Sequence, residues 1–296
     1  MDHTGFTRSS ELLGYPPDAR VLIVNCDDLG MHEDVDVAVV ESIEAGIARS
    51  CSLMTSGPSA RHAVGLLRRH PGITFGIHLT LVRDAVADRW GPLAAKEDVG
   101  SLLDEDGLLF TAARRGELRA RARTDEVEAE FRAQIDAVFG FGNGLGDGLR
   151  ERLTHLDFHC LADGGRDDVL AVATALAAEH GLAVRVWLDE GRRRMRRRGL
   201  PVTDNPFLDS FSVDVDTKPA RYARLLRDLP PGLSEWAVHP SVASERSRAV
   251  DGGWRVRRSD YEFLISPQAR ELIDREGITV IDYRPLQEVW ASSTSR

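Results

Sequence analysis

The chain has 296 residues, of which 42% are hydrophobic and 29% are charged, so it can bury a large core and general disorder is excluded. Its net charge of −9 argues against nucleic-acid binding, which needs a basic surface to neutralise phosphates. No apolar run approaches the ~20 residues of a membrane-spanning helix, and residues 1–20 lack the apolar stretch of a signal peptide, so we expect no membrane partner.

Strand-like and helix-like segments alternate along the chain. The continuous apolar run at residues 21–24 predicts a strand buried on both faces, and helical spacing of Val35, Val39 and Ile43 follows it. Similar patterns predict further strands near 51–55, 73–79, 153–158, 182–188, 234–239 and 278–282. Further helices are predicted near 59–69, 124–140, 167–180, 218–229 and 267–276. This alternation predicts an α/β fold with about seven parallel strands, either closed into a barrel or open and doubly wound.

Two longer irregular stretches interrupt this alternation, at residues 82–122 and 189–216. We expect them to be loop-like insertions of the kind that shape an active site. No linker divides the chain, so we predict an N-terminal tail over 1–19 and a single domain over 20–290.

Polar, metal-capable side chains follow several of the predicted strands. Asp27 and Asp28 end the first strand, and His78, His159 and His239 end three others. An aspartate pair could simply cap a helix, and a lone histidine is more often a hydrogen-bonded core residue. In parallel sheets, however, functional groups gather where the strands end, so four such strand ends predict a metal site.

The strand at 153–158 adds to this prediction, because its alternation places His155, Asp157 and His159 on one face. Such side chains are costly to bury without a partner. One carboxylate and two imidazoles would leave open positions on a metal ion, as hydrolytic sites require. A second aspartate could then act as general base and a histidine across the site as general acid.

Four short motifs, taken in order, resemble those of the YdjC/ChbG family of carbohydrate deacetylases, also called ChbG/HpnK. The resemblance covers about residues 20 to 285 and rests on N-C-D-D-L-G at 25–30, G-I-H-L-T at 76–80, T-H-L-D-F-H at 154–159 and H-P at 239–240. It implies a deformed (β/α) barrel, similar to that of NodB-type polysaccharide deacetylases. It also implies that one divalent metal ion serves to remove acetyl groups from N-acetylated sugars.

The resemblance assigns a role to each matching residue. Asp28, His78 and His159 would hold the metal, which could be Mg²⁺ or Zn²⁺, with Mn²⁺, Ni²⁺ and Co²⁺ also compatible. Asp27 would be the catalytic base and His239 the acid. Around these groups we expect His155 and Asp157 to orient the ligands. Arg185 could contact the substrate or hold Asp27.

Two features depart from the family pattern or stand outside it. Cys160-Leu161 follows His159 where the family usually continues with another histidine, which puts the choice of substrate in doubt. The arginine-rich run at 192–198 could be a solvated surface, or it could meet an anionic sugar or an acidic partner.

The expected partner is a small carbohydrate, with a homo-oligomeric state also compatible. Three cysteines are too few for a disulfide framework, so we expect reduced thiols and a cytoplasmic location. Two alternatives to the deacetylase stay open at this point. One is a metal hydrolase of another amide, ester or phosphoester bond, and the other is a sugar-binding barrel without activity.

Overall fold

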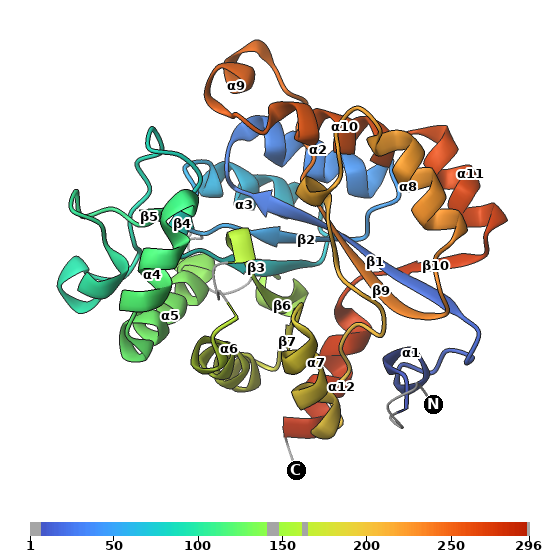
Figure 1. The fold of residues 1–296 in the computed structure, drawn as a ribbon, viewed down its shortest axis with the longest axis horizontal. Helices are drawn as coiled ribbons and strands as arrows, with labels where there is room; N and C mark the ends of the chain where they lie inside the picture. Colours follow the sequence, from blue (N-terminus) through green and yellow to red (C-terminus); the bar gives the residue numbers. More distant parts are fainter. Residues whose placement is uncertain (1–6, 141–147, 162–164, 295–296) are drawn as a thin grey trace.

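The computed structural model describes residues 7–140, 148–161 and 165–294. Within these ranges, the main sheet is parallel throughout and curls into a half-barrel (Figure 1). Seven strands run in the order β7-β6-β3-β2-β1-β9-β8, and β10 pairs with the first half of β1. The strands are β1 (Arg20–Leu29), β2 (Ser50–Leu53), β3 (Phe75–Leu79), β6 (Leu153–Phe158), β7 (Ala183–Val184), β8 (Leu208–Asp209), β9 (Gly232–Val238) and β10 (Ile278–Ile281).

The structure confirms the predicted α/β architecture, which is a deformed barrel with about seven parallel strands. All seven predicted strands form, and β8, from an insertion expected as a loop, adds an eighth. Continuous apolar runs, such as that of β1, suit strands that are covered on both faces. Residues 21–24 of β1, for example, are fully buried. Since the strands are parallel, the carboxyl ends of β1, β3, β6 and β9 meet at one rim of the half-barrel.

Helices flank the sheet on both sides. In Figure 1, α2, α3, α8, α10 and α11 lie above it, and α5, α6 and α12 lie below. The α-helices are α1 (Ser9–Leu12), α2 (Glu33–Glu44), α3 (Ala60–Arg69), α4 (Arg115–Arg121), α5 (Thr124–Gly140), α6 (Asp167–His180), α7 (Asp189–Arg197), α8 (Lys218–Arg227), α9 (Glu245–Val250), α10 (Trp254–Leu264), α11 (Pro267–Arg275) and α12 (Arg284–Thr294). Short 3₁₀ turns are η1 (Lys96–Asp98), η2 (Gly100–Leu102), η3 (Ala112–Arg114), η4 (Arg150–Arg152), η5 (His159–Leu161) and η6 (Ser210–Ser212).

Capping residues, proline and glycine mark the ends of several helices. Ser266 caps α11 by accepting a hydrogen bond from the Ala269 amide, and Pro267 occupies the first turn. Gly181 ends α6 in the left-handed conformation that glycine adopts without strain. The buried faces of these helices join the sheet in one hydrophobic core, in which Val24 of β1, Phe131 of α5 and Trp290 of α12 take part.

The two insertions contain more regular structure than loops. Residues 82–122 hold α4 and a short parallel pair, β4 (Val82–Arg83) with β5 (Phe110–Thr111). Residues 189–216 hold β8 and α7, so most of the arginine-rich run is helical. Arginine is a good helix former, and the acidic first turn of α7 supplies the pairs Arg192–Asp189 and Arg193–Glu190.

The segment expected as an N-terminal tail also carries structure. In α1, the backbone amides of Ser9 and Ser10 donate hydrogen bonds to the Asp204 carboxylate, which ties this segment to the loop before β8. Within the described ranges, none of the helices is long and apolar enough to cross a membrane.

Candidate active site

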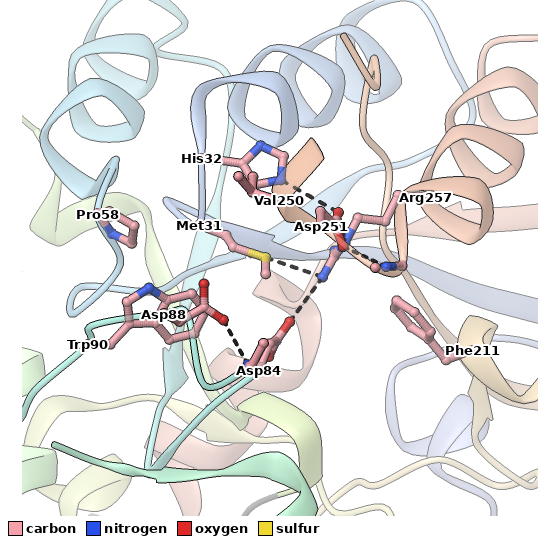
Figure 2. A pocket seen from close by; sticks show the side chains of 13 residues that line it. Met31, His32, Pro58, Asp84, Asp88, Trp90, Phe211, Val250, Asp251 and Arg257 are labelled. Carbon is pink, nitrogen blue, oxygen red and sulfur yellow. Dashed lines mark hydrogen bonds and ion pairs between the residues drawn. The ribbon is translucent and has the colours of Figure 1, made fainter. Parts of the chain in front are cut away.

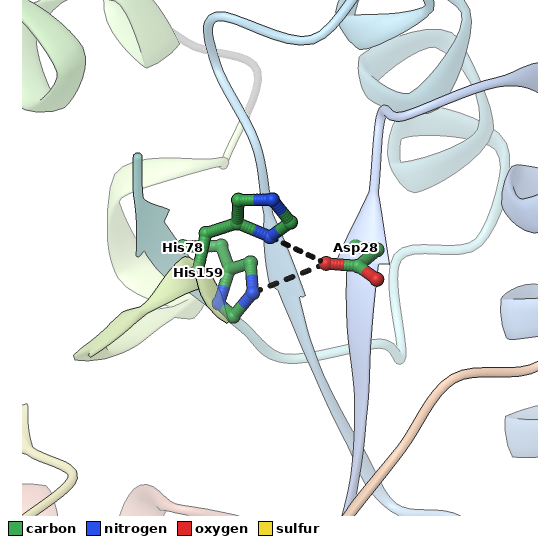
Figure 3. Close-up of side chains that lie close together, drawn as sticks. All are labelled: Asp28, His78 and His159. Carbon is green, nitrogen blue, oxygen red and sulfur yellow. Dashed lines mark hydrogen bonds and ion pairs between the residues drawn. The ribbon is translucent and has the colours of Figure 1, made fainter. Parts of the chain in front are cut away.

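The three predicted metal ligands meet at the rim of the half-barrel (Figure 3). Asp28 Oδ1 lies 3.2 Å from His78 Nε2 and 3.0 Å from His159 Nδ1. All three side chains are buried, and their donor atoms lie close enough together to hold one metal ion. The structure therefore brings together residues from β1, from β3 and from the turn after β6, as the sequence predicted.

His78 is oriented from behind by Asp157. The two residues lie opposite each other in the register of β3 and β6, and His78 Nδ1 lies 2.8 Å from Asp157 Oδ1. A carboxylate on Nδ1 leaves Nε2 to face Asp28, which is the usual support for a metal-binding histidine. Asp157 therefore holds His78 in place.

His155 lies deeper in the same strand. Its ring stacks on Tyr283 with centroids 3.7 Å apart, and its Nε2 lies 3.7 Å from Asp157 Oδ2. Gly76 on β3 makes room for this ring, because a Cβ there would come within 2.5 Å of it. His155 thus packs beneath Asp157 and supports the site from below.

His159 uses the opposite ring nitrogen from His78. Its Nδ1 faces Asp28, whereas its Nε2 lies 2.7 Å from Asp84 Oδ1. Asp84 follows β4 in the 82–122 insertion. The imidazole of His159 is therefore clamped between two carboxylates, one from the sheet and one from the insertion.

Asp28 has a strained backbone conformation and a side chain that pairs with a buried arginine. Its backbone has φ +68°, a left-handed conformation that an aspartate tolerates better than most residues but that still costs free energy. Arg257 on α10 donates from Nη1 to Asp28 Oδ2 at 2.7 Å, so Oδ1 is left to face the two histidines. Burial opposes ionisation of Asp28, but Arg257 and His159 outweigh it and hold the pKa of this carboxyl well below its usual range.

The residues at this point fit a divalent metal ion. His78 Nε2 is buried and makes no hydrogen bond, yet it points at the Asp28 carboxylate. Burial disfavours charge on His78, but the Asp157 and Asp27 carboxylates raise its pKa to about 10. Such an excess of negative charge around two imidazoles is what a cation would neutralise, and one carboxylate with two imidazoles is a donor set that suits zinc.

Asp27 lies beside this centre and is held by Arg185. Arg185 Nη1 and Nη2 donate to the two carboxylate oxygens of Asp27 at 2.7 and 2.9 Å. The same guanidinium lies 3.0 Å from Asp157 Oδ2 and donates to Glu235 Oε1 at 2.7 Å. Of the two possibilities left open by the sequence for Arg185, the structure shows contact with Asp27. Burial raises the pKa of Glu235, and Arg185 offsets only part of this effect.

His239 approaches Asp27 from the end of β9. Its Nε2 lies 4.0 Å from Asp27 Oδ2, and its Nδ1 shares a hydrogen bond of 2.8 Å with Ser210 Oγ. The His239 backbone amide donates to Asp260 Oδ2, which fixes the turn after β9. The ring therefore presents Nε2 toward the other predicted residues.

A cavity of about 370 Å³ opens above these groups. Its lining includes Asp27, Asp28, His159 and His239, together with Phe207 and Phe211. A second cavity of about 310 Å³ adjoins it and shares Asp84, Phe211 and Arg257 with the first (Figure 2). In Figure 2, Trp90 and Phe211 lie at opposite ends of this second cavity, with Asp84 between them. The lining of the two cavities includes aromatic side chains and six aspartates, together with Arg115 and Arg257.

The arginine-rich run does not line either cavity. Besides the two pairs named above, Arg197 lies 3.5 Å from Glu190 within α7, and Arg194 lies 2.7 Å from Asp167 of α6. The exposed arginines of the run therefore form local ion pairs, whereas Arg192 and Arg196 are largely buried and donate hydrogen bonds to the Thr203 carbonyl. Cys160 does line the larger cavity, whereas the side chain of Leu161 lies outside the described part of the chain.

Sequence reasoning missed three charged residues that shape the site. Glu235 carried a detectable signal, since it is a lone carboxylate within the apolar strand β9. Asp84 carried little signal, because it lies in an insertion without periodic pattern. Arg257 carried none, because α10 holds two more arginines, Arg255 and Arg258, and only the fold shows that Arg257 is the buried one.

Comparison with known proteins identifies the family of this chain. The family model described as YdjC-like protein matches residues 21–275. A carbohydrate deacetylase of Geobacillus stearothermophilus is 30% identical over 266 residues, covering 90% of this chain and 97% of the relative. A chitooligosaccharide deacetylase of Serratia marcescens is 27% identical over 273 residues, covering 90% and 99%.

The fold is also found among solved structures. One of them is that of a proposed cellobiose-phosphate cleavage protein from Enterococcus faecalis, with a TM-score of 0.75 and 24% sequence identity, covering 90% of this chain and 99% of the other. The family model spans most of the sequence and includes every predicted site residue. The chain belongs to the YdjC-like family.

Proposed function

We propose that this protein is a metal-dependent carbohydrate N-deacetylase, which hydrolyses the acetamido group of an N-acetylated sugar or small oligosaccharide. The observation that carries the proposal is the grouping of Asp28, His78 and His159 beside Asp27 and His239. All of these residues except His78 line one cavity. Membership of the family and the names of the curated relatives support the same reaction.

Asp28, His78 and His159 would hold the ion, with Mg²⁺ or Zn²⁺ as the first candidates and Mn²⁺, Ni²⁺ or Co²⁺ also compatible. When bound, the ion would supply Lewis acidity toward the acetyl oxygen and lower the pKa of water. Asp157 and Asp84 keep the two histidines pointed at it through their other ring nitrogens.

Asp27 would be the general base. Arg185 and Asn25 hold its carboxylate, and its Oδ2 lies 3.9 Å from His78 Nε2 and 4.0 Å from His239 Nε2. This position lets Asp27 take a proton from a water molecule that attacks the acetyl carbon. Because Arg185 occupies both oxygens from one side, the base is oriented before the substrate arrives.

His239 would be the general acid on the far side of the substrate. Ser210 accepts from or donates to Nδ1 and so orients the ring, which leaves Nε2 free to protonate the departing amine. Water adds to the acetyl carbon, the carbon–nitrogen bond breaks, and the products are acetate and an amino sugar. The amine product becomes cationic, and the acidic cavity lining suits a neutral substrate and a cationic product.

A substrate panel tests this reaction. Metal-loaded protein is incubated with N-acetylglucosamine, its phosphates and diacetylchitobiose, and released acetate and phosphate are measured separately. We expect acetate, with loss of release when a chelator removes the ion. Release of phosphate without acetate would make the protein a phosphoester hydrolase instead. Sugar binding with neither product would leave the sugar-binding alternative.

The remaining predictions concern the surroundings of the reaction. We propose a small carbohydrate as the partner and a cytoplasmic location. All three cysteines are unpaired, and Cys26 and Cys51 are buried in neighbouring strands, which supports reduced thiols.

A further inference from the structure

We infer that the protein has a second metal site at the mouth of the cavity, built from Asp84, His159 and Cys160. The site would take a thiophilic divalent ion, such as Zn²⁺, Cd²⁺ or Co²⁺. It shares His159 with the first site but uses the other ring nitrogen. This inference concerns metal binding and does not depend on the reaction proposed above.

The donor atoms are spaced as a tetrahedral thiolate site requires. Cys160 Sγ lies 3.5 Å from His159 Nε2 and 3.6 Å from Asp84 Oδ1. Zinc bonds to sulfur of about 2.3 Å and to nitrogen or oxygen of about 2.0 Å place such ligand atoms about 3.5 Å apart. His159 Nε2 and Asp84 Oδ1 lie 2.7 Å apart, so they would have to separate by about 0.6 Å to reach the tetrahedral spacing.

The surrounding chain allows that small movement and holds the thiol in place. The Asp84 side chain is 27% exposed and follows a strand of two residues, so it has room to shift. Cys160 has φ +51°, which turns the chain directly after His159, and its carbonyl accepts a hydrogen bond from Arg115 Nη1. Both Asp84 and Cys160 line the larger cavity, so an ion can reach them from solvent.

The ligand set predicts which ions enter. A thiolate and an imidazole favour zinc, cadmium and cobalt, whereas Mg²⁺ prefers an all-oxygen environment. On binding, the Cys160 thiol and any protonated ring nitrogen of His159 release their protons to solvent. Asp84 then exchanges its hydrogen bond with His159 for a bond to the ion.

Occupancy would also affect the proposed reaction. An ion at this position withdraws Asp84 from His159 and places a positive charge in the cavity above the first site. If the chain is the deacetylase proposed here, zinc beyond one equivalent should inhibit it. This part of the inference rests on the proposed function, and the binding experiment below does not.

A cobalt titration of the metal-free full-length protein tests the binding. We expect two Co²⁺ ions per chain and a near-ultraviolet thiolate-to-cobalt charge-transfer band. Cys160→Ser should bind one ion and lose the band. His78→Gln, which damages the first site only, should keep the band. Cys51→Ser is the matched thiol control and should keep it too, because Cys51 is buried within β2.

The outcomes separate the two proposals. Absence of the band in the wild type, or its persistence in Cys160→Ser, overturns the second site. A band without acetate release from any sugar overturns the proposed function and leaves the second site standing. With acetate release established, excess Zn²⁺ should inhibit the wild type at least about tenfold more strongly than Cys160→Ser, and excess Mg²⁺ should inhibit neither.

Discussion

The two walls of the candidate active site are built differently. The inner wall consists of Asp27, Asp157 and Glu235 around Arg185, all nearly fully buried and linked by contacts of 2.7 to 3.0 Å. The outer wall takes Asp84, Trp90 and Phe211 from the insertions, and Asp84 and Phe211 are accessible to solvent. The inner wall can hold reacting groups in fixed positions, whereas the outer wall can change without disturbing the sheet.

The first prediction concerns the inner wall and has the largest expected effect. Asp27→Asn should lower kcat about 10³-fold, because the amide cannot take a proton from water. One metal ion per chain should still bind, since Asp28, His78 and His159 are unchanged. Acetate release and metal content are measured on the same preparation. Asp209→Asn, which changes another carboxylate lining the cavity, is the control and should stay within about threefold of the wild type. A near-normal rate for Asp27→Asn would remove Asp27 from the role of base.

The second prediction tests how far the inner structure depends on buried charge pairs. Arg257→Met should lower the free energy of unfolding of the metal-free protein by about 3 kcal/mol, because Asp28 and Asp251 lose a buried cationic partner. Added Zn²⁺ should restore part of this loss, since the ion compensates Asp28. Denaturant unfolding with and without metal measures both effects. Arg258→Met, at the more exposed neighbouring position, should change the free energy by less than about 0.5 kcal/mol. Equal losses in the two variants would contradict the account.

The third prediction concerns protons that compete with the metal. In the metal-free protein His78 has a pKa of about 10, so it is protonated at neutral pH. A metal ion needs the neutral imidazole, so metal affinity should rise about tenfold per pH unit for each displaced proton, up to about pH 10. Calorimetry in buffers of different ionisation enthalpy should count at least one proton released per ion at pH 7. Metal binding without proton release would show that His78 is already neutral.

The fourth prediction addresses the outer wall and expects the smallest effect. Phe211→Ala should raise KM about fivefold, because an aromatic face stacked on a sugar contributes ~1 kcal/mol to binding. The value of kcat should stay within about twofold, because Ser210 still orients the His239 ring that Phe211 packs against. Steady-state kinetics on the preferred sugar measure both constants. Leu93→Ala, an exposed apolar residue outside both cavities, should change neither. A loss confined to kcat would place Phe211 nearer the chemistry than its position in the lining indicates.

The contrast between the walls also explains how much the sequence predicts. Every predicted strand forms, and the structure brings Asp27, Asp28, His78, His159 and His239 together. Local pattern suffices for this, since apolar runs define parallel strands and parallel strands share one carboxyl rim. Arg185 and Asp157 could be predicted from the sequence for the same reason, because they too lie on predicted strands.

The residues of the outer wall, and the contacts that they and Arg257 make with distant parts of the sequence, could not be predicted from local pattern. Asp84 contacts His159 across 75 positions of sequence, and Arg257 contacts Asp28 across 229. Neither contact follows from periodicity, because packing of insertions and helices against the rim decides them. The helix α7 was expected as a loop, since its charged sequence has few apolar positions and its stability comes from good helix formers and local ion pairs.

The central claim is that one ion held by Asp28, His78 and His159 is required for sugar deacetylation. The most direct test is acetate release during titration of the metal-free protein with Zn²⁺. We expect no release without metal and a rise to a maximum at one equivalent in the wild type, with His78→Gln inactive throughout at these concentrations. Acetate release by the metal-free wild type at the same rate as by the loaded protein would contradict the account.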